Sequence, residues 1–342
     1  MLSHAVEGEP PEQVLMQVTL GMWAAQAVAT AARLGIADAL AQSQPQDAAT
    51  LARAVQADAG ALSRLLRALV SIGVFAEPLP RQYALNAVGT LLRSDVSGSM
   101  RDWLIAETDT PHWQAWGQLH EGVRTGKTIV PQLFGMHIYE YYAAHPDDLA
   151  CFSAAMGNVS MLVAQGTVQH YDFSRSRHII DVGGAQGDLL LAILDANPHA
   201  RGTVFDQPQV IEAAHQAIHV RGHQQRCEAV GGDFFQAVPS GGDLYVLKFI
   251  LVDWRDAEAS QILRNCRSAM GPDGKLLVIE MTIPDDNHAT PAQLFDLNML
   301  VMTGGQERTV SEYESLFAQQ NFRLTDVIPT GSPFHLLEAV AV

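Results

Sequence analysis

The sequence predicts an α/β protein in which a helical N-terminal unit with a winged-helix outline precedes a doubly wound, mostly parallel sheet of seven strands. Helical patterns followed by one short hairpin occupy residues 10 to about 95. From about residue 171, short apolar runs alternate with helical patterns, which is typical of parallel strands joined by crossover helices. Two closely spaced apolar runs end the chain and predict an antiparallel hairpin added to five parallel strands.

The composition limits the classes of partner. The chain has 342 residues, of which 48% are hydrophobic, enough to build two cores. It has 21 Lys and Arg against 37 Asp and Glu, a net charge of −16, which disfavours binding to nucleic acid or to an anionic membrane. The three cysteines are odd in number and far apart, so they predict neither a disulfide framework nor a zinc site, and no metal is expected.

Two uncharged stretches, 13–32 and 149–171, are long enough to cross a membrane. Each contains several Gln, Thr, Asn or Ser residues, so we interpret them as buried or dimer-packing helices rather than as membrane spans. Residues 1–9 show no basic region followed by an apolar core, so no secretory signal is expected. The predicted location is the cytoplasm.

The clearest N-terminal helix is predicted over 58–72, ending before Gly73. Its apolar stripe recurs at helical spacing and consists of Leu62, Leu65, Leu66, Leu69 and Val70. Short strands at 74–76 and 83–85 complete a winged-helix outline. Winged helices often bind DNA, but this helix offers only Arg64 and Arg67 in an acidic chain, so packing against a second subunit is the favoured interpretation.

The chain is predicted to divide into three segments. Residues 1–95 form the winged-helix-like dimerisation domain, and 96–170 form a helical connection that contributes pocket walls. Residues 171–342 form the sheet domain. Its parallel strands are predicted at 178–182, 203–206, 227–230, 244–248 and 276–280, and its hairpin at 323–328 and 335–342.

A glycine-rich loop follows the first predicted strand. Residues 181–188 read Asp-Val-Gly-Gly-Ala-Gln-Gly-Asp, and the glycines allow the backbone to approach a ligand closely. Ala185 and Asp188 occupy the second and third glycine positions of the dinucleotide pattern G-x-G-x-x-G, so NAD is disfavoured. Because tight turns also use glycine, the loop alone would leave ligand binding undecided.

Charged residues end the next strands as well. Asp206 closes the second strand, where a carboxylate can accept hydrogen bonds from both hydroxyls of a ribose. Asp233 and Phe234 follow the third strand, where the aromatic ring can cover a base, and Lys248 ends the fourth. Together they predict a ligand at the carboxyl edge of the sheet.

This order of features resembles the class I S-adenosylmethionine-dependent methyltransferases, which have a Rossmann-like domain. Three further stretches resemble the plant and bacterial small-molecule O-methyltransferase family, namely 247–254, 295–300 and 304–309. The resemblance implies an N-terminal winged-helix-like dimerisation domain, a homodimer and S-adenosyl-L-methionine as cofactor. It places around that cofactor Asp181, Gly183, Gly187, Asp206, Asp233, Phe234 and Lys248.

Two positions depart from the family pattern. Ala185 stands where many members have glycine, a change that we expect the loop to tolerate. Val252 stands where the family has the histidine that deprotonates an acceptor hydroxyl, although the two glutamates that flank this histidine are matched by Glu280 and Glu307. The flanking glutamates therefore match the family, but the histidine that acts as its base is missing.

A phenol has a pKa near 10 and attacks well only as phenolate, whereas a ring nitrogen or an activated carbon needs little or no proton removal. Val252 therefore favours methylation of nitrogen or carbon in a small aromatic or heteroaromatic secondary metabolite. Relatives that methylate a phenazine ring nitrogen are expected to lack the histidine too.

Three alternatives stay open. In the first, His137 supplies the base for O-methylation. In the second, Glu280 or Glu307 acts as a base, orients the substrate or pairs with Arg308. In the third, the enzyme no longer methylates and is a hydroxylase, decarboxylase or pericyclase. Residues expected to line the acceptor pocket are Met156, Asn298, Met299 and Met302, although each also suits an ordinary helix core. The acceptor, the methylated atom and any pathway partner are not specified by the sequence.

Overall fold

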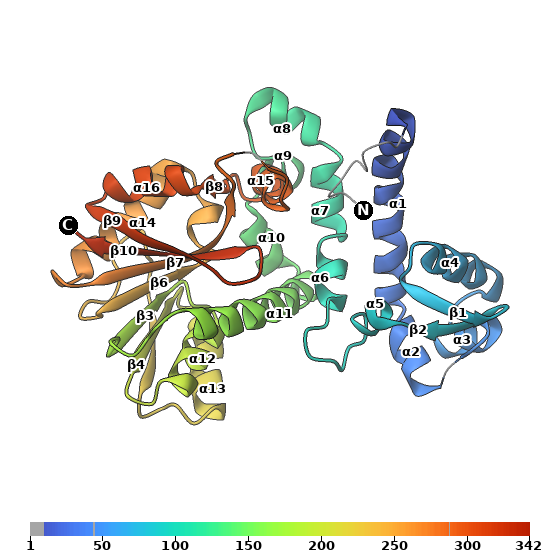
Figure 1. Cartoon of the computed structure of the whole chain (residues 1–342), viewed down its shortest axis with the longest axis horizontal. Coiled ribbons are helices and arrows are strands. Elements are labelled where there is room, and N and C mark those ends of the chain that lie inside the picture. Colours follow the sequence, from blue (N-terminus) through green and yellow to red (C-terminus); the bar gives the residue numbers. More distant parts are fainter. Residues whose placement is uncertain (1–9, 44, 287) are drawn as a thin grey trace. The chain divides into compact units, whose positions relative to one another are not determined.

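The computed structural model describes residues 10–43, 45–286 and 288–342, and the chain forms two compact units (Figure 1). Unit 1 comprises the chain up to Gly117 together with Tyr139–Val159, and unit 2 comprises Gln118–Ile138 and Ser160–Val342. The expectation that no secretory signal is present rests on residues 1–9 and lies outside the described residues.

Unit 1 consists of helices and one antiparallel hairpin. Its elements are α1 (Pro11–Arg33), α2 (Ile36–Gln42), α3 (Ala48–Ala54), α4 (Ala59–Ser71), β1 (Phe75–Leu79), β2 (Gln82–Leu85), α5 (Ala87–Thr90), α6 (Arg101–Ala106) and α7 (Thr110–Trp116). Two further helices have residues in both units, α10 (Ile138–Ala144) and α11 (Pro146–His170).

The predicted helix at 58–72 is confirmed as α4. The Asp58 carboxylate accepts a hydrogen bond from the Ala61 N–H and caps the first turn. Leu62, Leu66 and Leu69 of its stripe are buried in the core of unit 1. Helices α2, α3 and α4 followed by β1 and β2 form the predicted winged-helix outline.

Unit 2 contains the predicted sheet and its helices. Its elements are α8 (Leu119–Thr125), α9 (Val130–Phe134), β3 (His178–Val182), α12 (Asp188–Ala196), β4 (Arg201–Asp206), α13 (Ile211–Val220), β5 (Cys227–Gly231), β6 (Leu244–Lys248), the 3-10 turn η1 (Leu251–Asp253), α14 (Asp256–Ala269), β7 (Lys275–Ile283), α15 (Ala292–Met302), β8 (Arg308–Thr309), α16 (Val310–Ala318), β9 (Phe322–Pro329) and β10 (Phe334–Ala341).

The strand order is β5-β4-β3-β6-β7-β10-β9, with β3 to β7 parallel and β9 and β10 antiparallel, so the seven-stranded prediction is confirmed. The sequence did not predict β8, a two-residue strand that pairs with β7 off this path. Residues of α14 and α16 pack against the strands in the main core, and Figure 1 shows the sheet as one twisted surface with helices laid against it.

The chain order reverses at β3. It runs outward to β4 and β5 and then returns to β6 on the other side of β3. In doubly wound sheets a ligand binds in the crevice beyond the carboxyl ends of the strands at such a reversal. The fold therefore brings the ends of β3, β4 and β6 to one edge.

Candidate functional site

The loop after β3 requires glycine at two positions. Gly183 has a φ of +73°, and an added Cβ would lie 2.3 Å from Cδ1 of Ile250. Gly187 has a φ of +82°, and its added Cβ would lie 2.9 Å from Cγ2 of Val204. Left-handed backbone conformations and such close approaches both exclude larger residues. The structure therefore requires glycine at these two positions of the loop, as the motif predicts.

Asp206, at the end of β4, holds this loop in place. Its Oδ2 accepts a hydrogen bond from the Ala185 N–H at 2.8 Å, and its Oδ1 accepts one from the Gln207 N–H at 2.6 Å. Ala185 adopts a φ of +49°, which is unfavourable for a residue with a Cβ, so the bond to Asp206 helps to hold this conformation. Burial raises the pKa of Asp206. Each carboxylate oxygen keeps a second lone pair that a hydroxyl can use.

Buried Asp181 and partly buried Lys248 lie within electrostatic range of each other at the same edge of the sheet. Asp181 is 1% exposed, and within the described part of the chain neither carboxylate oxygen has a hydrogen-bond partner. Burial raises the pKa of Asp181 to about 7, against the attraction of Lys248. Burial also lowers the pKa of Lys248, whose Nζ donates to the Ser160 Oγ at 2.8 Å. Two buried oxygens without a donor fit a ligand that brings donors of its own.

Phe234 and Asp233 differ in their surroundings. Phe234 lies close to the glycine loop, since a Cβ added to Gly183 would be 3.8 Å from its Cε1. Its ring also contacts Phe235 edge to face. Asp233 is exposed, and its Oδ1 accepts a hydrogen bond from the Phe235 N–H at 2.9 Å. The structure therefore places Phe234 beside the loop, and Asp233 caps the turn that presents this ring.

Val252 lies in η1, beyond the end of β6, and is buried. Oε1 of Glu280 accepts hydrogen bonds from the N–H groups of Leu251, at 3.0 Å, and of Val252, at 3.3 Å. Burial raises the pKa of Glu280 to about 8, and the negative charge of Asp253 adds to the shift. The prediction that Glu280 ends its strand is wrong, because β7 continues to Ile283 and Glu280 lies inside it.

The segment 304–309 binds the other side of η1. The Gln306 N–H donates to the Val252 carbonyl at 2.9 Å. Arg308 is 1% exposed and donates to the carbonyls of Leu251, at 3.0 Å, and Trp254, at 2.9 Å. Its ion pair, also at 2.9 Å, is with Asp256 and not with either glutamate. Sequence reasoning missed Asp256, because nothing local signals that it pairs with a residue 52 positions away.

Glu307 stands between these two bound residues and is 8% exposed. Its N–H donates to Oδ1 of Asp296 in α15 at 3.0 Å. Its side-chain Oε2 is buried, and no residue that the structure describes offers it a hydrogen bond. Burial, with repulsion from Glu280 next, raises the pKa of Glu307 to about 9.

His137 has a constrained ring. Its Nε2 lies 3.2 Å from the carbonyl oxygen of Thr303, and its ring stacks parallel to Trp254 with centroids 6.4 Å apart. Because a carbonyl oxygen only accepts, Nε2 must carry a proton and cannot be the atom that removes one. A base role for His137 would have to use Nδ1.

Three of the four predicted acceptor residues share one helix of unit 2. Asn298 and Met302 are buried on α15, and Met299 is partly buried there, with its Sδ 3.7 Å from Oγ1 of Thr303. Met156 belongs to unit 1, on α11, so its assignment stays a prediction.

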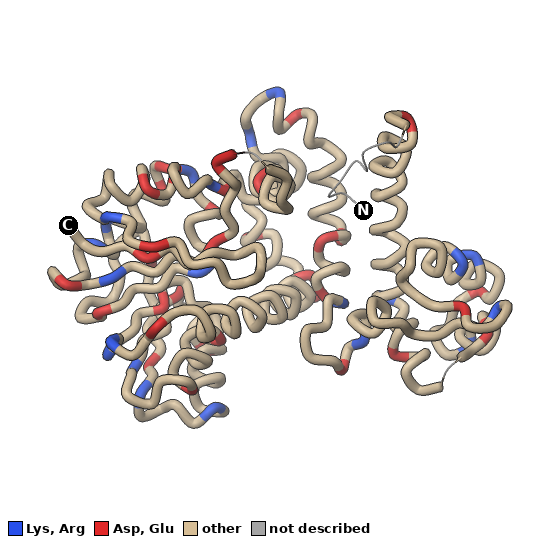
Figure 2. Tube along the Cα trace, in the orientation of Figure 1, with Lys and Arg blue, Asp and Glu red and all other residues tan. Residues whose placement is uncertain are grey.

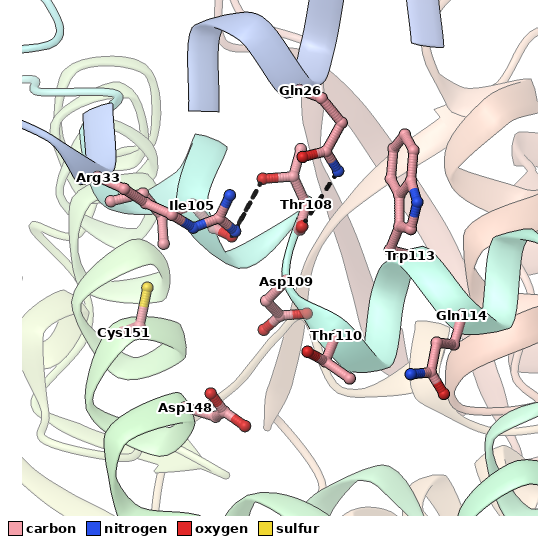
Figure 3. Close-up of a pocket in the computed structure, with 10 residues that line it drawn as sticks. All are labelled: Gln26, Arg33, Ile105, Thr108, Asp109, Thr110, Trp113, Gln114, Asp148 and Cys151. Atoms are coloured by element: carbon pink, nitrogen blue, oxygen red, sulfur yellow. Dashed lines mark hydrogen bonds between the residues drawn. The ribbon is translucent and has the colours of Figure 1, made fainter. Parts of the chain in front are cut away.

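A pocket of about 480 Å³ lies in unit 1 and contains none of the predicted site residues (Figure 3). Arg33 donates to the Ile105 carbonyl and to Thr108 Oγ1, and Gln26 donates to the Thr108 carbonyl. Asp109 caps α7 through the His112 N–H. Most of these polar groups hydrogen-bond to one another, although the buried Oδ2 of Asp109 has no hydrogen-bond partner among the described residues, and we assign no ligand to this pocket.

Basic residues are dispersed among acidic ones over both units, with Arg64 and Arg67 exposed on α4 (Figure 2). Within residues 10–43, 45–286 and 288–342, no group of three His, Cys, Asp or Glu side chains could hold a metal ion.

Comparison with known proteins matches nearly the whole chain. A family model described as an O-methyltransferase domain matches residues 116–323, and one described as an O-methyltransferase dimerisation domain matches residues 16–95.

Among curated proteins, the chain is 41% identical to a phenazine O-methyltransferase of Lysobacter antibioticus, with 96% of each chain covered. It is 35% identical to a phenazine-1-carboxylate N-methyltransferase of Pseudomonas aeruginosa, with 92% of each covered. Among solved structures, it superposes with a TM-score of 0.80 on an O-methyltransferase of neocarzinostatin biosynthesis in complex with S-adenosylmethionine and 2-hydroxy-5-methyl naphthoic acid. That match has 34% identity and covers 93% of this chain and 96% of the other.

Proposed function

The chain belongs to the O-methyltransferase family, whose members combine a dimerisation domain with an S-adenosylmethionine-dependent methyltransferase domain, and from this premise we propose that it methylates a nitrogen or carbon atom of a small aromatic or heteroaromatic acceptor. The enzyme class and the cofactor follow from the family. The atom that is methylated is the part of the proposal that depends on this chain's own residues.

The residues at the carboxyl edge of the sheet suit this cofactor. Asp206 offers two carboxylate oxygens for ribose hydroxyls, and Asp181 offers an amino group two buried oxygens that receive no hydrogen bond from the residues that the structure describes. Gly183 leaves the space that a side chain would fill, and Lys248 supplies positive charge for a carboxylate. When bound, the sulfonium supplies an electrophilic methyl group. The chain has to hold the acceptor in line with it and exclude water.

The observation that carries the choice of atom is the environment of Val252. The side chain at this position is apolar and buried, and the carboxylate of Glu280 accepts hydrogen bonds from the η1 backbone. Nothing at this position removes a proton. A general base increases the reaction rate by a factor of about 100 to 10,000. A phenol with a pKa near 10 needs such a base to attack, whereas a ring nitrogen does not.

The relatives support an aromatic acceptor. Two of them are named for phenazine substrates, one as an O-methyltransferase and one as an N-methyltransferase. O-methylation with another base is the second candidate, because the phenazine O-methyltransferase has the higher identity of the two. His137 could serve there only through Nδ1, since its Nε2 donates to Thr303.

The test is label transfer from methyl-labelled S-adenosylmethionine to matched acceptors. Phenazine-1-carboxylate, 1-hydroxyphenazine, a simple phenol and an enolisable carbon acid would be compared by mass spectrometry, with the labelled atom located by NMR. Label on nitrogen or carbon supports the proposal, and label on the phenolic oxygen alone contradicts it. Donor binding without transfer to any acceptor would indicate a family member that no longer methylates.

Two variants sharpen the test. Val252→His should raise transfer to a hydroxyl that reaches the methyl group. Val252→Asn is the control, because it adds a polar side chain without a basic nitrogen. Equal activities of the two variants on 1-hydroxyphenazine would show that a base at position 252 does not limit the rate.

The dimerisation domain indicates a homodimer. We also place the protein in the cytoplasm, since all three cysteines are free. Helices α1 and α11 are long and apolar enough to span a membrane, but they lie largely or wholly within segments matched by the two domain models. Recovery of the protein in a membrane fraction of its source cells would contradict this location. The division into 1–95, 96–170 and 171–342 stays a proposal.

A further inference from the structure

Glu307 has a fixed backbone and an unsatisfied side chain. The residues on either side of it, Gln306 and Arg308, hydrogen-bond to η1, and its own N–H donates to Asp296 of α15. The carboxyl group is therefore held between two elements. Its Oε2 is buried without a partner anywhere in the described chain, although a buried polar oxygen normally finds one.

The charges that face Glu307 come from four elements. Glu280 of β7, Asp253 of η1 and Asp296 of α15 all repel a negative charge there, and Arg308 of β8 attracts it. The guanidinium of Arg308 is already engaged with two carbonyls and Asp256. Burial is the largest cause of the raised pKa, so at neutral pH the carboxyl group carries a proton. Tyr313 of α16 also lies within electrostatic range.

A protonated carboxyl group has one O–H donor, whereas an ionised one only accepts. Building on the proposed function, we infer that Glu307 donates a hydrogen bond to the aromatic acceptor and selects molecules that carry an accepting oxygen or nitrogen atom other than the atom that is methylated. A ring nitrogen, a carbonyl or a carboxylate on the acceptor would satisfy it. Glu307 is thus a residue that determines specificity and not a general base.

The test compares Glu307→Met, which removes the donor, with Glu307→Gln, whose amide N–H imitates the neutral acid. Binding of phenazine-1-carboxylate to the protein loaded with S-adenosylhomocysteine would be measured by calorimetry at pH 7. We expect Glu307→Met to weaken binding at least about tenfold, the loss of one good hydrogen bond. Glu307→Gln should keep most of the wild-type affinity for phenazine-1-carboxylate. Binding unchanged in Glu307→Met would overturn the inference.

Kinetics separate the donor from a base. The KM for the acceptor should rise in Glu307→Met more than kcat falls, and in Glu307→Gln the activity should lose the alkaline decline expected near pH 9. If Glu307→Gln lowers kcat by a factor of about 100 or more while acceptor affinity is normal, Glu307 acts as a base and the inference is wrong. Glu258→Gln, an exposed glutamate on α14, is the matched control.

Folding and the proposed function are checked separately. Unchanged affinity for S-adenosylhomocysteine shows that each variant is folded. The calorimetric comparison measures binding and requires no turnover. It therefore tests the role of Glu307 even if the wild-type protein methylates a phenolic oxygen and the proposed methylation of nitrogen or carbon is wrong.

Discussion

The backbones at Gly305 and Val252 touch, since a Cβ added to Gly305 would lie 2.0 Å from the carbonyl oxygen of Val252. Gln306 and Arg308 also donate hydrogen bonds to η1, and Glu280 accepts hydrogen bonds from it, so η1 has little freedom to move. The backbone at Val252 is therefore rigidly held from both sides.

Gly305→Ala should destabilise the protein, because the overlap is with backbone and cannot be relieved by a side-chain rotation. Overpacking of this kind costs about 1–3 kcal/mol. Thermal unfolding would measure the loss. Gly271→Ala is the control, since nothing lies within 4 Å of its added Cβ. Equal unfolding temperatures for the two variants would contradict the contact.

Arg308→Leu should lower the free energy of unfolding much more than Asp256→Asn. The guanidinium is 1% exposed and holds the carbonyls of Leu251 and Trp254, so its loss leaves buried acceptors unsatisfied, at a cost of about 2–3 kcal/mol. The Asp256 side chain is 71% exposed, and asparagine keeps an oxygen that can accept the hydrogen bonds of Arg308, so this change should cost less. Denaturant titrations would compare the two variants, and a larger effect at Asp256 would refute this order.

The unfolding free energy should fall as the pH rises from about 5 to 9. The folded-state pKa values of Glu280 and Glu307, about 8 and 9, lie above the unfolded value of about 4.3, so in this range the folded protein binds more protons than the unfolded chain. The stabilisation is complete below the unfolded pKa and is lost as the pH passes the folded values. Unfolding temperatures without ligand should therefore decline with pH.

Glu307→Gln should make that decline shallower, because it removes one of the groups responsible. Glu258→Gln changes an exposed glutamate and should follow the wild-type slope. Identical slopes for Glu307→Gln and the wild-type protein would show that the Glu307 carboxyl does not titrate in this range.

Asp206→Ala should weaken binding of S-adenosylhomocysteine by at least about tenfold, or 1.4 kcal/mol. The change removes the oxygens proposed for the ribose and also frees the N–H of Ala185 in the glycine loop. Asp206→Asn keeps one acceptor oxygen and should be intermediate. Calorimetry would measure all three proteins, with the exposed Asp273→Ala as control. Unchanged affinity in Asp206→Ala would rule out the ribose assignment.

Helix α1 exposes a row of apolar side chains that suits a subunit interface. The exposed members are Leu15, Met16, Val18, Leu20, Met22 and Trp23. Trp23→Glu should convert dimers into monomers at micromolar concentration, as measured by light scattering after gel filtration. Val220→Glu, an exposed apolar position on α13, should remain dimeric. A dimeric Trp23→Glu would place the interface elsewhere.

Much of the fold could be predicted because its signals are local. The apolar runs at 178–182 and 244–248 correspond to β3 and β6 without change, and the bounds of α4 lie within one residue of the predicted 58–72. Strand β8 could not be predicted, since two residues carry no periodicity, and it forms only because Arg308 and Thr309 pair with the extended end of β7.

By itself the sequence determined that glycines follow the first strand, that Asp206 ends the second, and that valine stands at position 252, where the resemblance implies a histidine. These are facts about residue type and order, which local patterns express. Only the tertiary structure decided that Glu280 binds the amides of η1, that Arg308 pairs with Asp256, and that one oxygen of Glu307 has no partner in the described part of the chain. These contacts join residues 28 to 52 positions apart or depend on burial, and both arise only when the strands and helices pack together.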